Sequence, residues 1–184
     1  MRNKTNLESY TTGTFKIGKG KIIQILWYIV NVLFFINPLN PISSLKVFLL
    51  RLFGAQIGRG VVIKPGVNIK YPWKLKAGNF VWLGENVWID NLEFVEIGDN
   101  SVLSQGAMLL CGNHDYKKIG FDLITDPIRV EEGVWIGAKS VVAGGVVCRS
   151  HSVLAVNSVA SNDLNEYSIY RGNPAVFIKE REIN

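Results

Sequence analysis

Residues 130–159 read VEEGVW IGAKSV VAGGVV CRSHSV LAVNSV, which are five consecutive six-residue units. Each unit opens with an aliphatic residue, or with Cys148, and carries Val or Ser at its fifth position. The same register recurs earlier, in IGRGVV from Ile57, LGENVW from Leu83, IGDNSV from Ile97 and LSQGAM from Leu103. A short fixed period is typical of a solenoid, in which a unit buries its apolar face only against its neighbours. We expect a triangular coil of short parallel strands, with the first residue of each unit pointing inwards.

The repeat is interrupted once, and the interruption contains a histidine. It reads CGNHDYKKIGFDLITDPIRV from Cys111 to Val130 and is rich in Gly, Asn, Asp and Pro. This composition predicts a loop that leaves the coil at about residues 110–129. Loops on a rigid scaffold often carry catalytic residues. An imidazole can accept a proton near neutral pH, so His114 is the candidate general base and indicates an enzyme.

Residues 1–54 form an N-terminal arm that precedes the repeat. Residues 22–36 read IIQILWYIVNVLFFI, and a second apolar helix is expected before Gly54. Fifteen helical residues span roughly 22 Å, which is short of the ~30 Å needed to cross a bilayer. Two interpretations remain open. The arm either covers the open end of the solenoid, or it attaches to a membrane surface through residues 16–53.

The charge distribution and the cysteine content exclude several classes of protein. Residues 1–54 hold seven Lys or Arg against one acid, whereas residues 55–184 hold thirteen basic and fourteen acidic residues. The solenoid therefore has no basic face for nucleic acid. Two cysteines and two histidines, far apart in sequence, predict neither a disulfide framework nor a metal site. We expect a reduced, cytoplasmic compartment, with membrane attachment placing the protein at the inner face.

The repeating units, together with Gly112–Tyr116 and the stretch from Asp126 to Gly137, resemble the hexapeptide-repeat acyltransferases. The likeness is to their sugar O-acetyltransferase branch, which includes maltose and galactoside acetyltransferases, and within it to the colanic-acid-biosynthesis type. This resemblance implies a left-handed parallel β-helix domain over residues 55–184, which includes a short C-terminal tail. The handedness comes from the family, because the general rule for parallel crossovers would favour a right-handed coil. The resemblance also implies a homotrimer with sites between subunits.

The resemblance further implies site residues. His114 matches the family's general base, and no metal is involved. The residues matched to acceptor binding are Asp90, Asn91, Asp115, Tyr116 and Trp135. The residues matched to acetyl-CoA are Gly137, Ala138, Val156, Ser161, Asn162, Arg171 and Lys179. Ala138 would offer its backbone N–H to the thioester oxygen. The chain has Val176 and Asn162 where the family often has basic residues, and Arg149 is a further candidate for the CoA phosphates.

The expected activity is acetyl transfer from acetyl-CoA to a saccharide hydroxyl, in exopolysaccharide or surface-glycan assembly. An amino-sugar nitrogen and an antibiotic hydroxyl are alternative acceptors. A non-catalytic scaffold at the membrane is the alternative from another class, and the histidine-bearing interruption argues against it. Turn chemistry is the alternative role for Asp90 and Asn91, because Asx residues favour corners.

Overall fold

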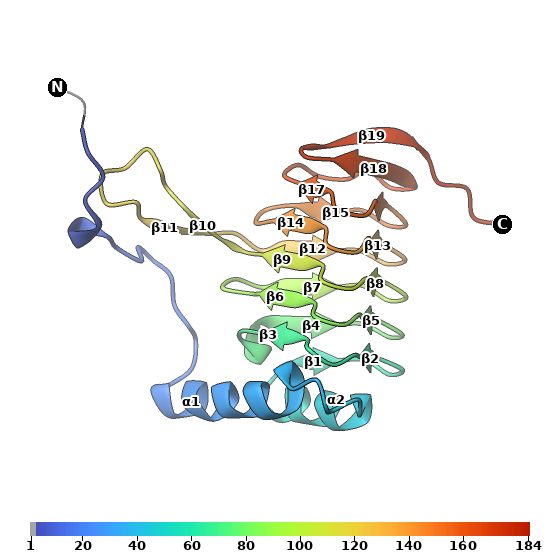
Figure 1. Ribbon diagram of the computed structural model, residues 1–184, viewed down its shortest axis with the longest axis horizontal. Helices are drawn as coiled ribbons and strands as arrows, with labels where there is room; N and C mark the ends of the chain where they lie inside the picture. Colours follow the sequence, from blue (N-terminus) through green and yellow to red (C-terminus); the bar gives the residue numbers. More distant parts are fainter. Residues whose placement is uncertain (1–2) are drawn as a thin grey trace.

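The computed structural model describes residues 3–184, so the first two residues of the predicted arm lie outside the described residues. Short strands follow one another around three faces of a triangular coil, and successive turns stack along one axis (Figure 1). Strands at equivalent positions of neighbouring turns pair in parallel. This architecture confirms the predicted parallel β-helix with an N-terminal helical segment.

We name the three sheets of the coil face A, face B and face C. Face A contains β1 (Gln56–Ile57), β4 (Leu75–Ala77), β7 (Val95–Ile97), β12 (Ile128–Val130) and β15 (Val147–Cys148). Face B contains β2 (Val62–Ile63), β5 (Trp82–Leu83), β8 (Val102–Leu103), β13 (Trp135–Ile136), β16 (Val153–Leu154), β18 (Ser168–Gly172) and β19 (Ala175–Glu180). Face C contains β3 (Asn68–Ile69), β6 (Trp88–Asp90), β9 (Met108–Leu110), β14 (Val141–Ala143) and β17 (Val159–Ala160).

The core of the coil consists of the first residues of the six-residue units, as the repeat predicts. These side chains are at most 1% exposed at Ile63, Ile69, Leu83, Ile89, Leu103, Leu109, Ile136 and Leu154. The fifth position is buried as well, and it holds small residues, mostly Val or Ser. Two of the buried serine hydroxyls donate to carbonyls of the next turn, from Ser101 to Glu131 at 2.7 Å and from Ser140 to Ala155 at 2.7 Å, whereas the Ser152 hydroxyl has no partner among the described residues. A serine can thus be satisfied inside the coil at some of these positions.

The N-terminal helices cover the first turn of the coil (Figure 1). Helix α1 (Lys21–Val30) runs directly into the π-helix η2 (Asn31–Ile36), and α2 (Ser43–Leu52) follows; two 3-10 helices are η1 (Leu7–Ser9) and η3 (Pro72–Lys74). The indole N–H of Trp27 donates to the carbonyl of Ile69 at 2.9 Å, and the Lys46 ammonium donates to the carbonyl of Lys64 at 2.9 Å. Within residues 3–184, none of the helices has the length and apolar character that a membrane crossing requires.

The interruption of the repeat forms a β-hairpin. The chain leaves the coil after β9 of face C, forms β10 (Gly112–His114) and β11 (Leu123–Thr125), and returns to β12 of face A. The hairpin extends away from the coil, towards the segment that precedes α1 (Figure 1). At the far end of the coil, β18 and β19 form a second antiparallel pair that lengthens face B.

The close stacking of turns leaves no room for a side chain at Gly98. A Cβ atom at this position would lie 2.6 Å from the backbone carbon of Glu131 and 2.6 Å from the backbone nitrogen of Glu132. Gly98→Ala must therefore push two turns apart, and we expect a loss of about 1–3 kcal/mol in the free energy of unfolding. Denaturant unfolding measures this loss. Gly20→Ala is the control, because a Cβ there meets nothing within 4 Å. Equal stability of the two variants would contradict the account.

Candidate active site

His114 lies on β10, and a backbone carbonyl sets its protonation pattern. Its Nδ1 lies 2.9 Å from the carbonyl oxygen of Phe121. Because a carbonyl oxygen can only accept, Nδ1 carries the proton and donates, which leaves the Nε2 lone pair available. The imidazole also stacks on the Phe121 ring, with centroids 4.4 Å apart and planes inclined by 9°. The ring is therefore fixed in orientation as well as in tautomer.

Phe121 both accepts the hydrogen bond from Nδ1 and stacks on the imidazole, and its backbone conformation is strained. Its φ is +55°, in the left-handed region that a bulky side chain rarely adopts. Such a conformation persists only where surrounding contacts stabilise it. Seven other non-Gly residues of the described chain share it, Phe80 and Tyr167 among them, so it marks a tight turn and is not by itself a sign of function. Here the conformation lets the ring and the carbonyl of one residue contact the same imidazole.

The N-terminal strap, which we define as residues 6–15, holds this part of the hairpin. The Asn6 N–H donates to the carbonyl of Ile119 at 2.9 Å, and the Leu123 N–H donates to the carbonyl of Thr11 at 3.0 Å. The Thr11 N–H donates to the Asp122 carboxylate at 3.0 Å. This backbone hydrogen bond is the main reason why the pKa of Asp122 is lowered from its ordinary value. The strap also brings the Tyr10 ring within 6.0 Å of the His114 ring.

His114 faces the part of the coil that lies below the hairpin. Gly112 and His114 are two residues apart on one strand, so their side-chain directions share a face of the hairpin. A Cβ atom at Gly112 would lie 2.5 Å from Leu92 Cδ1 and 3.9 Å from Asp90 Oδ2. The imidazole is therefore directed to the side on which Asp90 lies, at the corner between faces C and A.

Asp90 and Asn91 are both predicted to bind the acceptor sugar, but the structure gives them different environments. Asp90 pairs with Lys70, with 2.8 Å between Oδ1 and Nζ, and its side chain remains partly exposed. Asn91 is fully buried. Its amide oxygen accepts from the Tyr71 N–H at 2.9 Å and its amide nitrogen donates to the Tyr71 carbonyl at 2.6 Å. Asn91 is thus occupied in linking two turns, and the acceptor role predicted for it is not supported by its position.

Asp115 and Tyr116 lie at the outer turn of the hairpin. The Asp115 carboxylate accepts the Lys117 N–H at 3.1 Å, which is turn chemistry and leaves only Oδ2 for an acceptor. Tyr116 is highly exposed. Neither residue orients His114, because the carbonyl of Phe121 does so. The sequence did not indicate a role for Phe121 or Tyr10. No local pattern predicts the positive φ of Phe121, and none predicts a contact between Tyr10 and His114, which are about a hundred residues apart.

Another corner, between faces B and C, holds Trp135, which the resemblance matches to the acceptor, and the residues matched to the reacting end of acetyl-CoA. Trp135 is exposed on β13 and donates its indole N–H to the Ser104 hydroxyl at 2.9 Å. Gly137 packs against the next turn, and its N–H donates to the carbonyl of Leu154. The Ala138 N–H donates no hydrogen bond within residues 3–184, so it can serve as an oxyanion donor. Val156 is exposed at the equivalent corner one turn later.

The residues matched to the rest of CoA are dispersed. Ser161 and Asn162 are exposed after β17, while Arg171 and Lys179 are exposed on β18 and β19. Arg149 is engaged with Asp163 at 3.4 Å. The hairpin follows β9 of face C, whereas Ala138 precedes β14 of the same face, so the two lie at opposite ends of these parallel strands. One chain therefore does not bring His114 together with Trp135, Gly137, Ala138 and Val156.

The two cysteines are poor nucleophiles. Burial raises the pKa of the Cys111 thiol to about 11 and that of Cys148 to about 12. Both side chains are at most 1% exposed. Thiols in this state are protonated at neutral pH and inert. Cys111 therefore contributes packing at the base of the hairpin.

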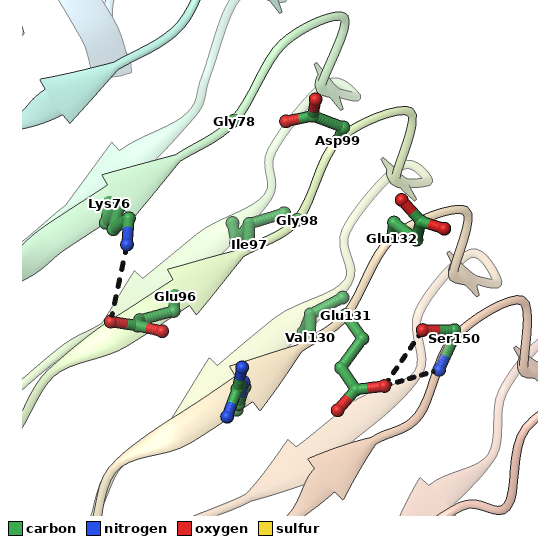
Figure 2. Close-up of a pocket in the computed structure, with 11 residues that line it drawn as sticks. Lys76, Gly78, Glu96, Ile97, Gly98, Asp99, Val130, Glu131, Glu132 and Ser150 are labelled. Carbon is green, nitrogen blue, oxygen red and sulfur yellow. Dashed lines mark hydrogen bonds and ion pairs between the residues drawn. The ribbon is translucent and has the colours of Figure 1, made fainter.

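A charged depression of about 380 Å³ lies on face A, and none of its lining residues belongs to β10 or β11 (Figure 2). Its carboxylates have structural partners: Glu131 accepts the Ser150 N–H and hydroxyl, both at 2.9 Å, and Asp99 accepts the Asn79 N–H at 2.8 Å. Figure 2 shows these residues projecting from successive turns. We assign this depression to the joining of turns. Across residues 3–184, no group of three or more His, Cys, Asp or Glu side chains could hold a metal ion.

Comparison with known sequences identifies relatives of this chain. No protein-family model matches the chain. It is 38% identical over 167 residues to a colanic acid biosynthesis acetyltransferase, WcaF, of Escherichia coli (strain K12), and the aligned residues cover 91% of each chain. It is 27% identical over 130 residues to the galactoside O-acetyltransferase of the same organism, covering 68% of this chain and 64% of that protein.

Solved structures share the fold. The hexapeptide-repeat acetyltransferase VCA0836 of Vibrio cholerae O1 biovar eltor, complexed with acetyl coenzyme A, superimposes with a TM-score of 0.80 at 20% identity, over 96% of this chain and 97% of that one. A galactoside acetyltransferase in complex with coenzyme A gives a TM-score of 0.77 at 22% identity, over 88% and 82% of the two chains.

A parallel coil of six-residue units, broken once by a histidine-bearing hairpin, defines a hexapeptide-repeat enzyme. Given its 38% identity over nearly the whole length of such a relative, the chain belongs to the sugar acetyltransferases of the hexapeptide-repeat family. It is an acyltransferase, so the family and the enzyme class predicted from the sequence are confirmed.

We expect the hydrogen bond between Thr11 of the strap and Asp122 to support the activity, because it holds the residues beside Phe121. Asp122→Ala removes the acceptor of the Thr11 N–H and loosens residues 121–123. We expect kcat to fall by up to about 100-fold with little change in KM, because a displacement of about 1 Å in a catalytic group has an effect of this size. Lys118→Ala is the control, since Lys118 contacts Asp122 at 3.3 Å without touching the strap. Steady-state kinetics of both variants measure the effect, and equal losses would argue against a role for the strap.

Proposed function

We propose that the protein transfers an acetyl group from acetyl-CoA to a saccharide hydroxyl in the assembly of a surface polysaccharide. One observation carries the proposal: the tautomer and ring orientation of His114 are fixed, with Nε2 left free on a hairpin that projects from the coil. The names of the relatives, a colanic acid biosynthesis acetyltransferase and a galactoside O-acetyltransferase, support a saccharide as acceptor.

In the proposed mechanism, Nε2 of His114 accepts the proton of the acceptor hydroxyl as its oxygen attacks the thioester carbonyl carbon. The carbonyl electrons move onto oxygen, where the Ala138 N–H stabilises the charge of the tetrahedral intermediate. The intermediate then collapses and the carbon–sulfur bond breaks. The imidazolium returns its proton to the leaving thiolate, so that the products are the acetyl ester and free CoA. The Phe121 carbonyl accepts from Nδ1–H throughout and favours the charged ring.

The proposed site lies between copies of the chain in a homotrimer. The separation of His114 from Ala138 supports this arrangement, because a neighbouring copy must supply the second residue. Face B supports it as well. Trp82 and Trp135 are about half exposed there and lie in register with Val102 between them. A row of exposed apolar side chains of this kind favours burial against another subunit.

Release of free thiol from acetyl-CoA in the presence of saccharide acceptors tests the activity. We expect His114→Ala to lose about 10²- to 10⁴-fold in kcat while folding normally, which is the usual contribution of a general base. Cys111→Ser should keep its activity, because the buried thiol has a pKa of about 11 and takes no part. A comparable loss in both variants would contradict the assignment of His114.

We also propose that the arm attaches the protein to the inner face of a membrane. One side of α1 packs on the coil through Trp27, and the opposite side remains apolar and exposed. The exposed apolar side chains on α1 and η2 include Ile22, Ile25, Leu26, Ile29 and Leu33. Lys16, Lys19 and Lys21 lie at the start of α1 and complement anionic lipid. An exposed apolar stripe beside a basic end supports interfacial binding.

Flotation with phosphatidylglycerol-containing vesicles tests this attachment. We expect the wild-type protein to float, and the double variant Ile25→Glu, Ile29→Glu to remain in the dense fraction. Val176→Glu is the matched control, because Val176 is equally exposed but lies on β19 at the far end of the coil. Failure of the wild-type protein to bind at low salt would refute the attachment without affecting the proposed chemistry.

A further inference from the structure

A second cavity lies between helix α1 and the first turns of the coil. Its volume is about 310 Å³. We call it the arm pocket, and its walls include Gln24, Tyr28, Asn68, Lys70, Tyr71 and Trp73. Nothing in the mechanism proposed above uses this cavity.

The walls of the arm pocket combine aromatic rings with uncharged polar groups. Tyr71 and Trp73 stack on each other with centroids 5.2 Å apart and planes inclined by 26°. Burial raises the pKa of the Tyr71 phenol, so the hydroxyl keeps its proton at physiological pH. Gln24 and Asn68 add amides. The Gln24 amide nitrogen donates to the Lys19 carbonyl and the Asn68 amide oxygen accepts from Asn31, both at 2.8 Å, so the other atom of each amide is the one that can meet a ligand. Apolar surface with a few fixed hydrogen-bonding groups suits a ligand that has both C–H faces and hydroxyls.

The charge of the pocket excludes a strongly anionic ligand. Lys70 is the only charged residue in its lining, and Asp90 neutralises it at 2.8 Å. No unpaired cation among the lining residues is therefore left for a phosphate. A neutral polyhydroxylated ligand fits this balance best.

The position of the pocket connects it to His114. Asn68, Trp88 and Met108 pair in register across three successive turns of face C, and the hairpin leaves the coil from the last of these turns. Parallel strands are about 4.8 Å apart, so the pocket lies about 10 Å below the base of the hairpin. Between them lies Asp90, which contacts Lys70 on the pocket side and lies near Gly112 on the hairpin side. The hairpin and α1 project from the coil in the same direction (Figure 1).

We propose that the arm pocket is a binding subsite for a sugar unit of the acceptor other than the one that is acetylated. The acceptor is then an oligosaccharide that extends from His114, past the Lys70–Asp90 pair, to the Tyr71–Trp73 stack. This proposal rests on the proposed function, because it assumes that the reacting sugar lies at His114. Binding energy from the remote sugar orients the reacting hydroxyl, so an acceptor reduced to one sugar reacts less well.

The experiment uses an array of bacterial surface oligosaccharides together with their component monosaccharides. Saturation-transfer NMR measures binding of each sugar to the full-length protein, and thiol release from acetyl-CoA measures turnover. We expect oligosaccharides to bind at least tenfold more tightly than their monosaccharides. Tyr28→Ala should abolish this difference and leave monosaccharide turnover unchanged, because Tyr28 is an exposed wall of the pocket on α1.

Ile29→Ala is the matched control, since Ile29 is exposed on the same helix but lies outside the pocket. The subsite is overturned if Tyr28→Ala binds oligosaccharides as the wild-type protein does, if the control loses binding equally, or if no oligosaccharide on the array binds. Binding that depends on Tyr28 without thiol release would instead leave the subsite standing and refute the acetyl transfer.

Discussion

The structure depends on the hydrogen-bond ladder that joins each turn of the coil to the next. Every face repeats the same parallel pairing, and the buried first residues of the units stack beneath it. The ladder also anchors the hairpin. The Cys111 N–H donates to the Asp90 carbonyl at 3.2 Å, and the Asp126 N–H donates to the Cys111 carbonyl at 3.0 Å. An excursion of the chain can thus leave the coil and return without disturbing the core.

The imidazole of His114 is oriented by the main-chain carbonyl of Phe121 in the same hairpin, and a distant segment of the sequence holds that part of the hairpin. The carbonyl of Phe121 holds Nδ1, and the strap holds the residues beside Phe121 through Thr11. A main-chain carbonyl, and not a carboxylate, accepts from Nδ1–H and so orients the ring. In the proposed mechanism, the dipole of this carbonyl favours the cationic ring that forms during the reaction.

The fold could be predicted from the sequence because a six-residue period specifies burial one turn at a time. Position one of each unit needs an aliphatic side chain, and Ile63, Ile89 and Leu154 meet that need within their own local segment. Position five also proved to be buried, and Ser101 shows why a polar residue is allowed there. The site was less predictable, because its members are joined by contacts that no local pattern encodes. Asn91 illustrates the difficulty, since an Asx residue at a corner can face either a ligand or a neighbouring turn.

What the sequence alone determined is the solenoid, the single interruption in it and the histidine that the interruption carries. Each of these is a property of neighbouring residues and of a repeated spacing. Tertiary structure alone decided the tautomer of His114, the bond between the strap and the hairpin, and the cavity between α1 and face C. It also decided that His114 and Ala138 lie at different corners of one chain. The tautomer depends on how the hairpin folds back so that the Phe121 carbonyl meets the imidazole. The strap contact, the cavity and the separation of His114 from Ala138 depend on segments far apart in sequence, so the physical interactions that create them exist only in the folded chain.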